Sequence, residues 1–194
     1  SLGDVDKTIE CYQESINIYT DIGDKLGRGV TIGKMGNAAI MVGSYDDALK
    51  LLNVAVGIAQ AVGNRMWDVL HQADIAAVYA HQGEIDKGLE LLEKIIPQAK
   101  EVGSPILINY THSLLAGILL YAGELNRAAE ASRMAIEYVN PANRHYEYAL
   151  YGVILVRLND WDAAQDAFNN TLDHAAELLE NTPNLYSPKY SRGL

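Results

Sequence analysis

The chain has 194 residues, of which 49% are hydrophobic and 21% charged, so it is long and apolar enough to bury a core. Its 25 acidic and 15 basic residues give a formal net charge of -10. This balance argues against binding to nucleic acid or to an anionic membrane, because both need a basic surface. A single cysteine, Cys11, excludes an internal disulfide and a cysteine-based zinc cluster. No apolar run is long enough to predict a membrane-spanning helix, and no signal-like segment opens the sequence.

Two series of glycines recur along the chain at one constant interval of about 40 residues. Each glycine is followed by a polar residue, a pattern typical of a helix end and the start of the next helix. Asn159 begins a further copy of the first series after a slightly shorter interval, and Asn143 takes the fourth place of the second series. We expect Asn143 to adopt the left-handed backbone conformation that glycine would supply there. The first series is Gly3, Gly43, Gly83 and Gly123, and the second is Gly23, Gly63 and Gly103.

Between these glycines, apolar residues recur at the spacing of amphipathic helices, and no strand-like alternation competes with them. Pro97 lies inside one of these apolar stripes, so we expect it to kink or shorten its helix. The short connections require neighbouring helices to run antiparallel, and a repeated helix pair forms an α-solenoid. The predicted fold class is therefore all-α. About nine helices are expected, at residues 4–20, 27–42, 45–62, 66–82, 85–101, 106–122, 125–139, 144–158 and 161–180.

Small and large residues alternate at fixed places in each helix pair. In the first full repeat Gly36 is the small residue of the first helix and Leu52 the large residue of the second; Gly152 and Phe168 take these places in the last repeat. Small residues let the two helices of a pair approach closely, and the larger ones fill the gap to the next repeat. The pattern resembles the tetratricopeptide repeat (TPR) family, in a variety whose period is longer than the family's usual one. The resemblance implies a right-handed superhelix of antiparallel helix pairs.

The domain organisation follows from the repeats. We expect one TPR-like domain over residues 1–182, with residues 183–194 as a tail or the start of a further repeat. The first helix lacks a partner before it, which predicts a fragment of a longer protein and self-association through the exposed terminal helices. The apolar face concerned carries Ile9, Tyr12 and Ile16. Within the domain we expect a half repeat at 3–20 and full repeats at 27–62, 66–101, 106–139 and 144–180.

In the TPR family the first helices of the pairs line a concave groove, so the resemblance implies a peptide-binding site on those helices. Small residues there leave room for a guest, and the tyrosines can stack or form hydrogen bonds. Packing inside the repeats is the alternative for each tyrosine. The expected site residues on this face are Lys34, Asn37, Met41, Asp74, Ala77, His81, Tyr110, Ser113, Tyr121, Tyr146 and Arg157.

Catalytic and metal-binding patterns are sparse in the sequence. His71 with Asp74, and His174 with Glu177, are spaced to share a helix face, but two ligands make no metal site. We expect both pairs to be surface salt bridges, and Cys11 to be a small core residue. The sequence offers neither an activated nucleophile nor a nucleotide-binding fingerprint, so no enzymatic activity, cofactor or metal is expected.

The predicted function is that of a non-catalytic scaffold module that binds a protein or peptide. The alternative is a small-ligand sensor domain of a multidomain signalling or transcription regulator, which a closed pocket with convergent polar groups would favour. We expect no nucleic-acid or membrane partner, and a cytoplasmic location. The acidic residues at the predicted helix starts are expected to cap helix dipoles and keep the array soluble.

Overall fold

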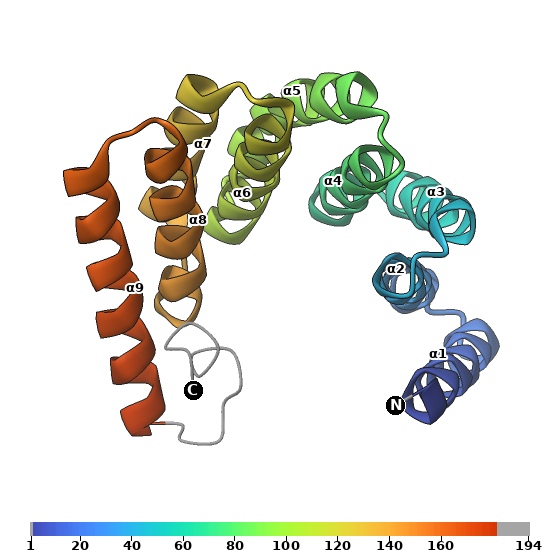
Figure 1. The fold of residues 1–194 in the computed structure, drawn as a ribbon. Helices are drawn as coiled ribbons and strands as arrows, with labels where there is room; N and C mark the ends of the chain where they lie inside the picture. The colour runs from blue at the N-terminus through green and yellow to red at the C-terminus, as the bar shows by residue number, and fades with distance from the viewer. Residues whose placement is uncertain (1, 182–194) are drawn as a thin grey trace. The chain divides into compact units, whose positions relative to one another are not determined.

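The computed structural model describes residues 2–181 of the chain, and the expected tail at 183–194 lies outside the described residues. Within residues 2–181 the chain is all-α, with nine α-helices, one short 3-10 helix and no strand, and its fold is an α-solenoid of antiparallel helix pairs (Figure 1). The chain divides into two compact units, Ser1–Val102 and Gly103–Leu194.

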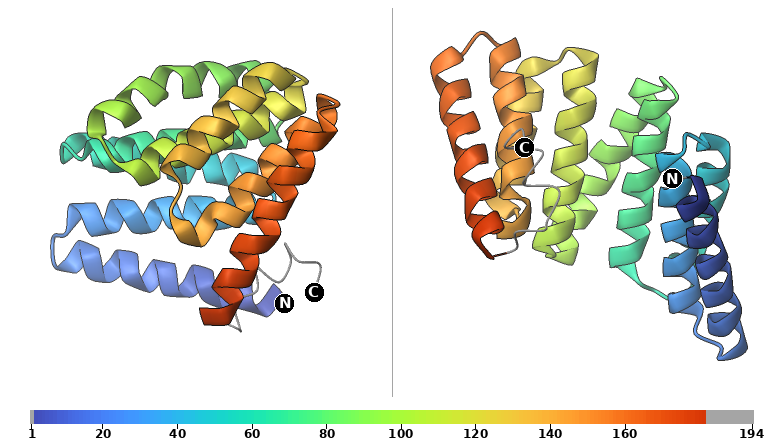
Figure 2. Two further views of the ribbon diagram at one scale, coloured as in Figure 1. Left: turned by 90° about the vertical axis from the view of Figure 1, so that its left-hand side faces the viewer. Right: turned by 60° about the horizontal axis from the view of Figure 1, so that its bottom comes forward.

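The first unit contains the five helices α1 to α5. Consecutive helices pack against each other and alternate in direction, as two further views also make clear (Figure 2). Ala48 and Leu52 from α3 and Ile75 and Val78 from α4 form a buried core cluster, on which partly buried side chains such as Val56 pack. The five helices are α1 (Leu2–Asp21), α2 (Lys25–Met41), α3 (Tyr45–Ala61), α4 (Arg65–His81) and α5 (Ile85–Val102).

The second unit contains α6 to α9, again packed in sequence as α6 on α7, α7 on α8 and α8 on α9. Leu155, Ala164 and Ala167 form its core cluster between α8 and α9, with Tyr151 and Phe168 packed around it. Its elements are α6 (Pro105–Ala122), α7 (Leu125–Tyr138), a 3-10 turn (Pro141–Asn143), α8 (Arg144–Arg157) and α9 (Trp161–Asn181).

Six of the seven glycines of the two series end helices as the repeat pattern predicts, whereas Gly3 lies inside α1. Gly43, Gly83 and Gly123 all have a φ angle of 77 to 82 degrees, which costs a glycine nothing and a larger residue about 1 kcal/mol or more. Asn159 takes the same role with a φ of 61 degrees. The expectation for Asn143 is wrong. Its φ is -110 degrees, because the chain makes a 3-10 turn before α8 in place of the glycine-type turn.

Close approach within the helix pairs confirms the predicted role of the small residues. A Cβ atom on Gly36 would lie 2.8 Å from Cγ of Leu52, and one on Gly152 would lie 2.6 Å from Cε1 of Phe168. Both distances are too short for two carbon atoms, so the large side chain of the second helix requires a bare backbone on the first.

Two local expectations need correction. Helix α5 continues through Pro97 to Val102, so the proline does not shorten it; Pro97 is exposed, and the helix retains its buried face around Ile95 and Ala99. Cys11 is exposed on α1 instead of lying in the core. The apolar stripe around Cys11 thus predicted helix α1 correctly, but it did not predict which side of that helix is buried.

Candidate functional site

The face expected to bind a partner is formed by the first helices of the pairs, α2 and α4 in the first unit and α6 and α8 in the second. We call it the first-helix face and treat each unit separately. In the first unit Lys34 and Met41 are exposed, Met41 with 88% of its surface open, and Asn37 and Ala77 are half-buried. His81 is exposed and stacks flat on Tyr45, with the ring centroids 5.5 Å apart. This part of the face is polar and mixed.

His71 and Asp74 do not form the expected surface pair. Both are buried on α4 with 1% exposure, and Nδ1 of His71 lies 3.6 Å from Oδ2 of Asp74. The imidazole stacks on Trp67 and fills the space beside Gly33 of α2, where a Cβ atom would lie 2.1 Å from its Cε1. The bare backbone of Gly33 admits the ring, so the pair is enclosed between two first helices.

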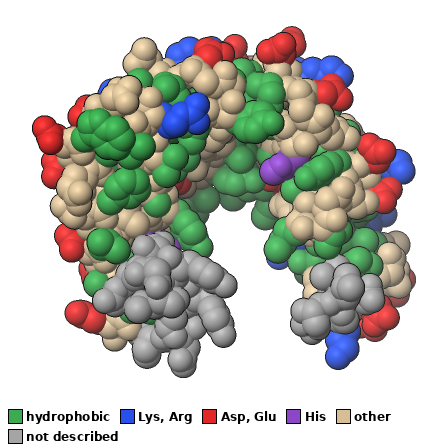
Figure 3. Space-filling model, viewed as in Figure 1, with side chains coloured by type: hydrophobic (Ala, Val, Ile, Leu, Met, Phe, Trp, Pro, Cys, Tyr) green, Lys and Arg blue, Asp and Glu red, His purple; other side chains and the backbone are tan. Residues whose placement is uncertain are grey.

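In the second unit the first-helix face is apolar and aromatic. Helix α6 has no charged residue, and its Tyr121 is 78% exposed. On α8, Tyr146 and Val153 are 51% and 45% exposed, and Arg157 is also exposed. Tyr110 and Ser113 are half-buried. Hydrophobic side chains gather at the surface of this unit in the space-filling view, with acidic side chains at its edge (Figure 3).

Helix α6 is long and apolar enough by length and composition to cross a membrane, which the sequence analysis did not anticipate. Its buried residues, 39% of the helix, pack within a helical repeat, and α7 covers one of its sides. Helices that form the core of a repeat often pass the same test, so we interpret the apolar composition as packing plus an exposed apolar face.

A buried carboxylate joins α6 and α8 in the second unit. Glu147 is 5% exposed and accepts a hydrogen bond of 2.9 Å from Nδ2 of Asn109, which also donates to the backbone oxygen of Ala135 at 3.0 Å. Burial raises the pKa of Glu147 above its ordinary value, although hydrogen bonds from Asn109 and Ser113 partly offset that effect. Ser113, an expected ligand-binding residue, is thus a structural partner of Glu147.

The sequence analysis missed Glu147, because a glutamate in a helix start ordinarily faces solvent. His145, two residues earlier, is fully buried, and its ring lies 4.3 Å from that of Tyr146. Burial, with a smaller contribution from His174, lowers the pKa of His145. Glu147 occupies the same repeat position as His71 and Thr111 in the preceding repeats, and both of those residues are buried. Burial of one member of this series would therefore have indicated burial of Glu147.

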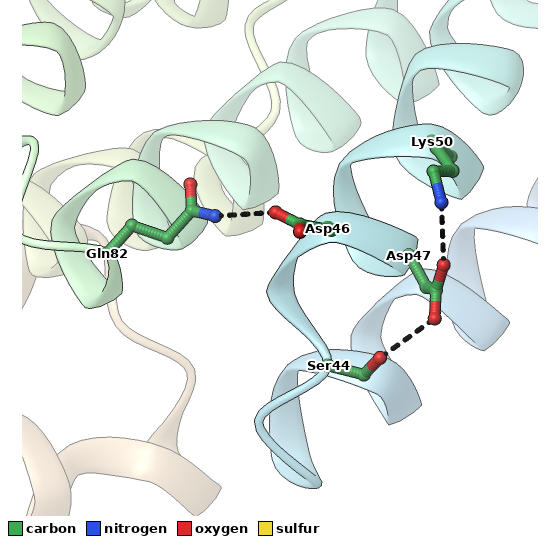
Figure 4. Close-up of polar contacts among 5 residues, drawn as sticks. All are labelled: Ser44, Asp46, Asp47, Lys50 and Gln82. Carbon is green, nitrogen blue, oxygen red and sulfur yellow. Dashed lines mark hydrogen bonds and ion pairs between the residues drawn. The ribbon is translucent and has the colours of Figure 1, made fainter.

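The start of α3, with Ser44 just before it, carries a polar cluster that also contacts the residue after α4 (Figure 4). Ser44 donates to Asp47 at 2.9 Å, Lys50 donates to the same carboxylate at 3.0 Å, and Gln82, just after α4, donates to Asp46 at 3.1 Å. The hydrogen bond from Lys50 is the main cause that lowers the pKa of Asp47. Asp47 therefore stabilises the first turns of α3, and Asp46 links the start of α3 to the residue that follows α4.

An open groove of about 390 Å³ lies in the first unit and is lined by side chains of α3, α4 and α5. On α4 the groove residues Gln72, Ile75 and Tyr79 lie about 160° around the helix from Asp74 and Ala77, so the groove is on the side opposite the first-helix face. The sequence analysis did not anticipate it. Its lining residues are Asn53, Val56, Gln60, Gln72, Ile75, Tyr79, Lys87, Glu90, Leu91 and Lys94.

Metal-binding and catalytic geometry is scarce in the part of the chain that the structure describes. No group of three His, Cys, Asp or Glu residues there is placed to hold a metal ion. His174 and Glu177, the second predicted pair, lie 3.7 Å apart, and Glu177 is 75% exposed. This pair is a surface contact, as expected.

No family model matches this sequence, and no curated protein matches it. Solved structures do resemble the fold. BtubC (BKLC) from P. vanneervenii superposes with a TM-score of 0.73 at 12% identity, over 91% of this chain and 75% of that protein. The apo form of RapI gives a TM-score of 0.74 at 15% identity, over 89% of this chain and 64% of RapI. MamA gives 0.63 at 16% identity, over 93% of this chain and 98% of MamA.

These similarities establish the fold, which is that of TPR-like helical-repeat proteins, as the sequence analysis predicted. At identities of 12 to 16% they carry no residue-level correspondence of function.

Proposed function

We propose that the chain is a non-catalytic scaffold module that binds an apolar peptide segment of a partner protein on the first-helix face of its second unit. The observation that carries the proposal is the exposed apolar surface of α6 and α8. Tyr121, Tyr146 and Val153 leave 45 to 78% of their surfaces open there. Exposed aromatic and aliphatic groups on one face are typical of protein-binding surfaces.

The expected site residues divide by exposure under this proposal. In the second unit Tyr121, Tyr146 and Arg157 are open to a partner, and Ser113 would support the surface from beneath through Glu147. Lys34, Met41 and His81 are exposed in the first unit, outside the proposed site. Arg157 at the end of α8 would meet a carboxylate of the partner.

The small-ligand sensor is not favoured by a specific observation. The groove on α3 to α5 is open to solvent, whereas small-molecule sites enclose most of their ligand. We also propose a cytoplasmic location, because an exposed free cysteine persists in a reducing compartment.

A selection from a peptide library displayed on phage tests the proposal, followed by affinity measurements on the selected peptides. Val153→Glu should weaken binding at least about tenfold, or about 1.4 kcal/mol, because it places a charge in the apolar face. Leu172→Glu is a matched control, since Leu172 on α9 has the same 45% exposure as Val153 but lies outside α6 and α8. Equal losses in both variants, or no enriched peptide at all, would contradict the proposal.

A further inference from the structure

The groove between α3 and α5 has an apolar floor bounded by polar side chains. Val56, Ile75 and Leu91 come from three different helices and form the floor. All three also belong to the core cluster of this unit or pack on it, so the floor is fixed by the fold. An occupant would add apolar contact to a surface that is already rigid.

The two ends of the groove are chemically alike. Neighbouring helices run antiparallel, so Gln60, Gln72 and Lys94 meet at one end, and Asn53, Tyr79 and Lys87 meet at the other. Lys87 and Lys94 are two helical turns apart on α5, which separates them by about 10 Å along the helix. Each end therefore has one ammonium group and at least one side-chain amide. At the Lys94 end the amides of Gln60 and Gln72 both donate to Asp68, at 3.1 and 2.7 Å, so the ammonium group is the donor left for an occupant.

The charge of this groove opposes that of the whole chain. Two lysines and one glutamate line it, whereas the chain as a whole has a net charge of -10. Lys87 pairs with Glu84 and lies over the ring of Tyr79, 5.7 Å from its centroid. Lys94 is exposed and forms no ion pair within the described residues. Glu90 stands between the lysines and repels carboxylates from the middle of the groove.

We propose that this groove is a second docking site, for an amphipathic helix of a partner protein with aliphatic side chains at its centre and carboxylates two turns apart. The aliphatic side chains would cover Val56, Ile75 and Leu91. The two carboxylates, at positions i and i+7 of the partner helix, would reach Lys94 and Lys87. Helices seat readily in a groove between two others, because side-chain ridges fit between them. This site is independent of the first-helix face.

Synthetic helical peptides test the proposal on the full chain. The acidic probe is an alanine- and glutamine-rich peptide of about 15 residues, long enough to form a helix, with Leu at i+3 and i+4 and Glu at i and i+7. The reversed probe has Lys in place of both Glu residues. Fluorescence anisotropy should give an affinity at least about tenfold higher for the acidic probe at low salt, and the difference should shrink as salt is added.

Two variants of α5 make the test specific. Lys94→Glu should abolish the preference for the acidic probe or reverse it. Lys100→Glu makes the same charge change on the same helix outside the groove, and should retain the preference. Blocking the groove gives a second readout, since Asn53→Trp should prevent binding and the neighbouring Val54→Trp should not; Val54 is 51% exposed and does not line the groove.

Four results would overturn the proposal. They are equal binding of the two probes, no binding of either, equal effects of Lys94→Glu and Lys100→Glu, and loss of acidic-probe binding in Val153→Glu. The last would place the peptide on α6 and α8. Sedimentation tests whether a second copy of the chain occupies the groove instead. A dimer that Lys94→Glu abolishes, in a chain that binds neither probe, would assign the groove to self-association and overturn the proposal.

Discussion

Equivalent positions of the repeat are filled differently in the two units. Ser113 follows Gly33 by two full periods of the repeat, and Glu147 follows His71 by one full period and one shortened period. In the first unit a bare glycine backbone on α2 receives the buried imidazole of α4. In the second, the side chains of Asn109 and Ser113 on α6 donate hydrogen bonds to a buried carboxylate of α8.

This difference shows that the repeat determines which positions of two first helices are in contact. It does not determine whether that contact is made by packing or by hydrogen bonds. The junction in the first unit depends on shape, because His71 fills space that a larger neighbour would occupy. The junction in the second depends on hydrogen bonds, because a buried carboxylate without donors is costly. The surfaces differ as well: the first-helix face is mixed on α2 and α4, where Lys34 and Met41 are both exposed, and mainly apolar on α6 and α8.

Gly33→Ala should give the largest effect, because its new Cβ would lie 2.1 Å from Cε1 of His71. Overpacking of this kind costs about 3 kcal/mol, from which the better helix propensity of alanine recovers about 1 kcal/mol. Urea denaturation should therefore register a loss of about 2 kcal/mol or more in the free energy of unfolding.

A matched control for Gly33→Ala is Gly57→Ala on α3, where a Cβ atom meets nothing within 4 Å. That variant should be about 0.5–1 kcal/mol more stable than the wild type. Adding His71→Ala to Gly33→Ala should relieve the clash, so the double variant should lose less than the sum of the two single losses. Strict additivity would mean that shape does not hold this junction.

Asn109→Ala should cost about 2 kcal/mol, because it removes donors from the Glu147 carboxylate and from the backbone oxygen of Ala135. Thermal denaturation at neutral pH measures the effect. Asn170→Ala on α9 is the control, since Nδ2 of Asn170 donates only to Asp166 of its own helix, at 2.8 Å. A loss no larger than that of the control would argue against a hydrogen-bonded junction.

Glu147→Gln should have the smallest effect on total stability and the most distinctive pH dependence. The folded-state pKa of Glu147 is raised by burial, so its contribution is fully present below the unfolded pKa of about 4.5 and is lost as pH rises toward the folded value. A glutamine at this position can still accept the hydrogen bond from Asn109, and because it does not ionise, the pH-dependent loss of stability is removed. The variant should therefore gain melting temperature relative to wild type between pH 4 and pH 8.

The same substitution at the exposed Glu137 of α7 controls for the removal of one carboxylate. If the wild-type and Glu147→Gln curves stay parallel over that pH range, burial does not raise the pKa of Glu147, and the proposed contrast between the two junctions is wrong for the second one.

The sequence by itself determined the helices and their repeat. The glycine period located the turns, and the predicted boundaries agree with the observed helices to within a few residues, because glycine's tolerance of positive φ is a local property. The close approach at Gly36 and Gly152 was also predictable, since the two helices of one pair keep a fixed spacing along the chain.

Only the tertiary structure decided which polar groups are enclosed. His71 and Glu147 occupy helix positions that the sequence pattern assigned to the surface or did not mark. Each is buried because a neighbouring repeat, tens of residues away, supplies a gap for His71 and a hydrogen-bond donor for Glu147. The groove between α3 and α5 arises in the same way, from side chains of three helices whose proximity no local pattern encodes. Helix formation depends on near neighbours in the chain, whereas burial and surface chemistry depend on distant ones.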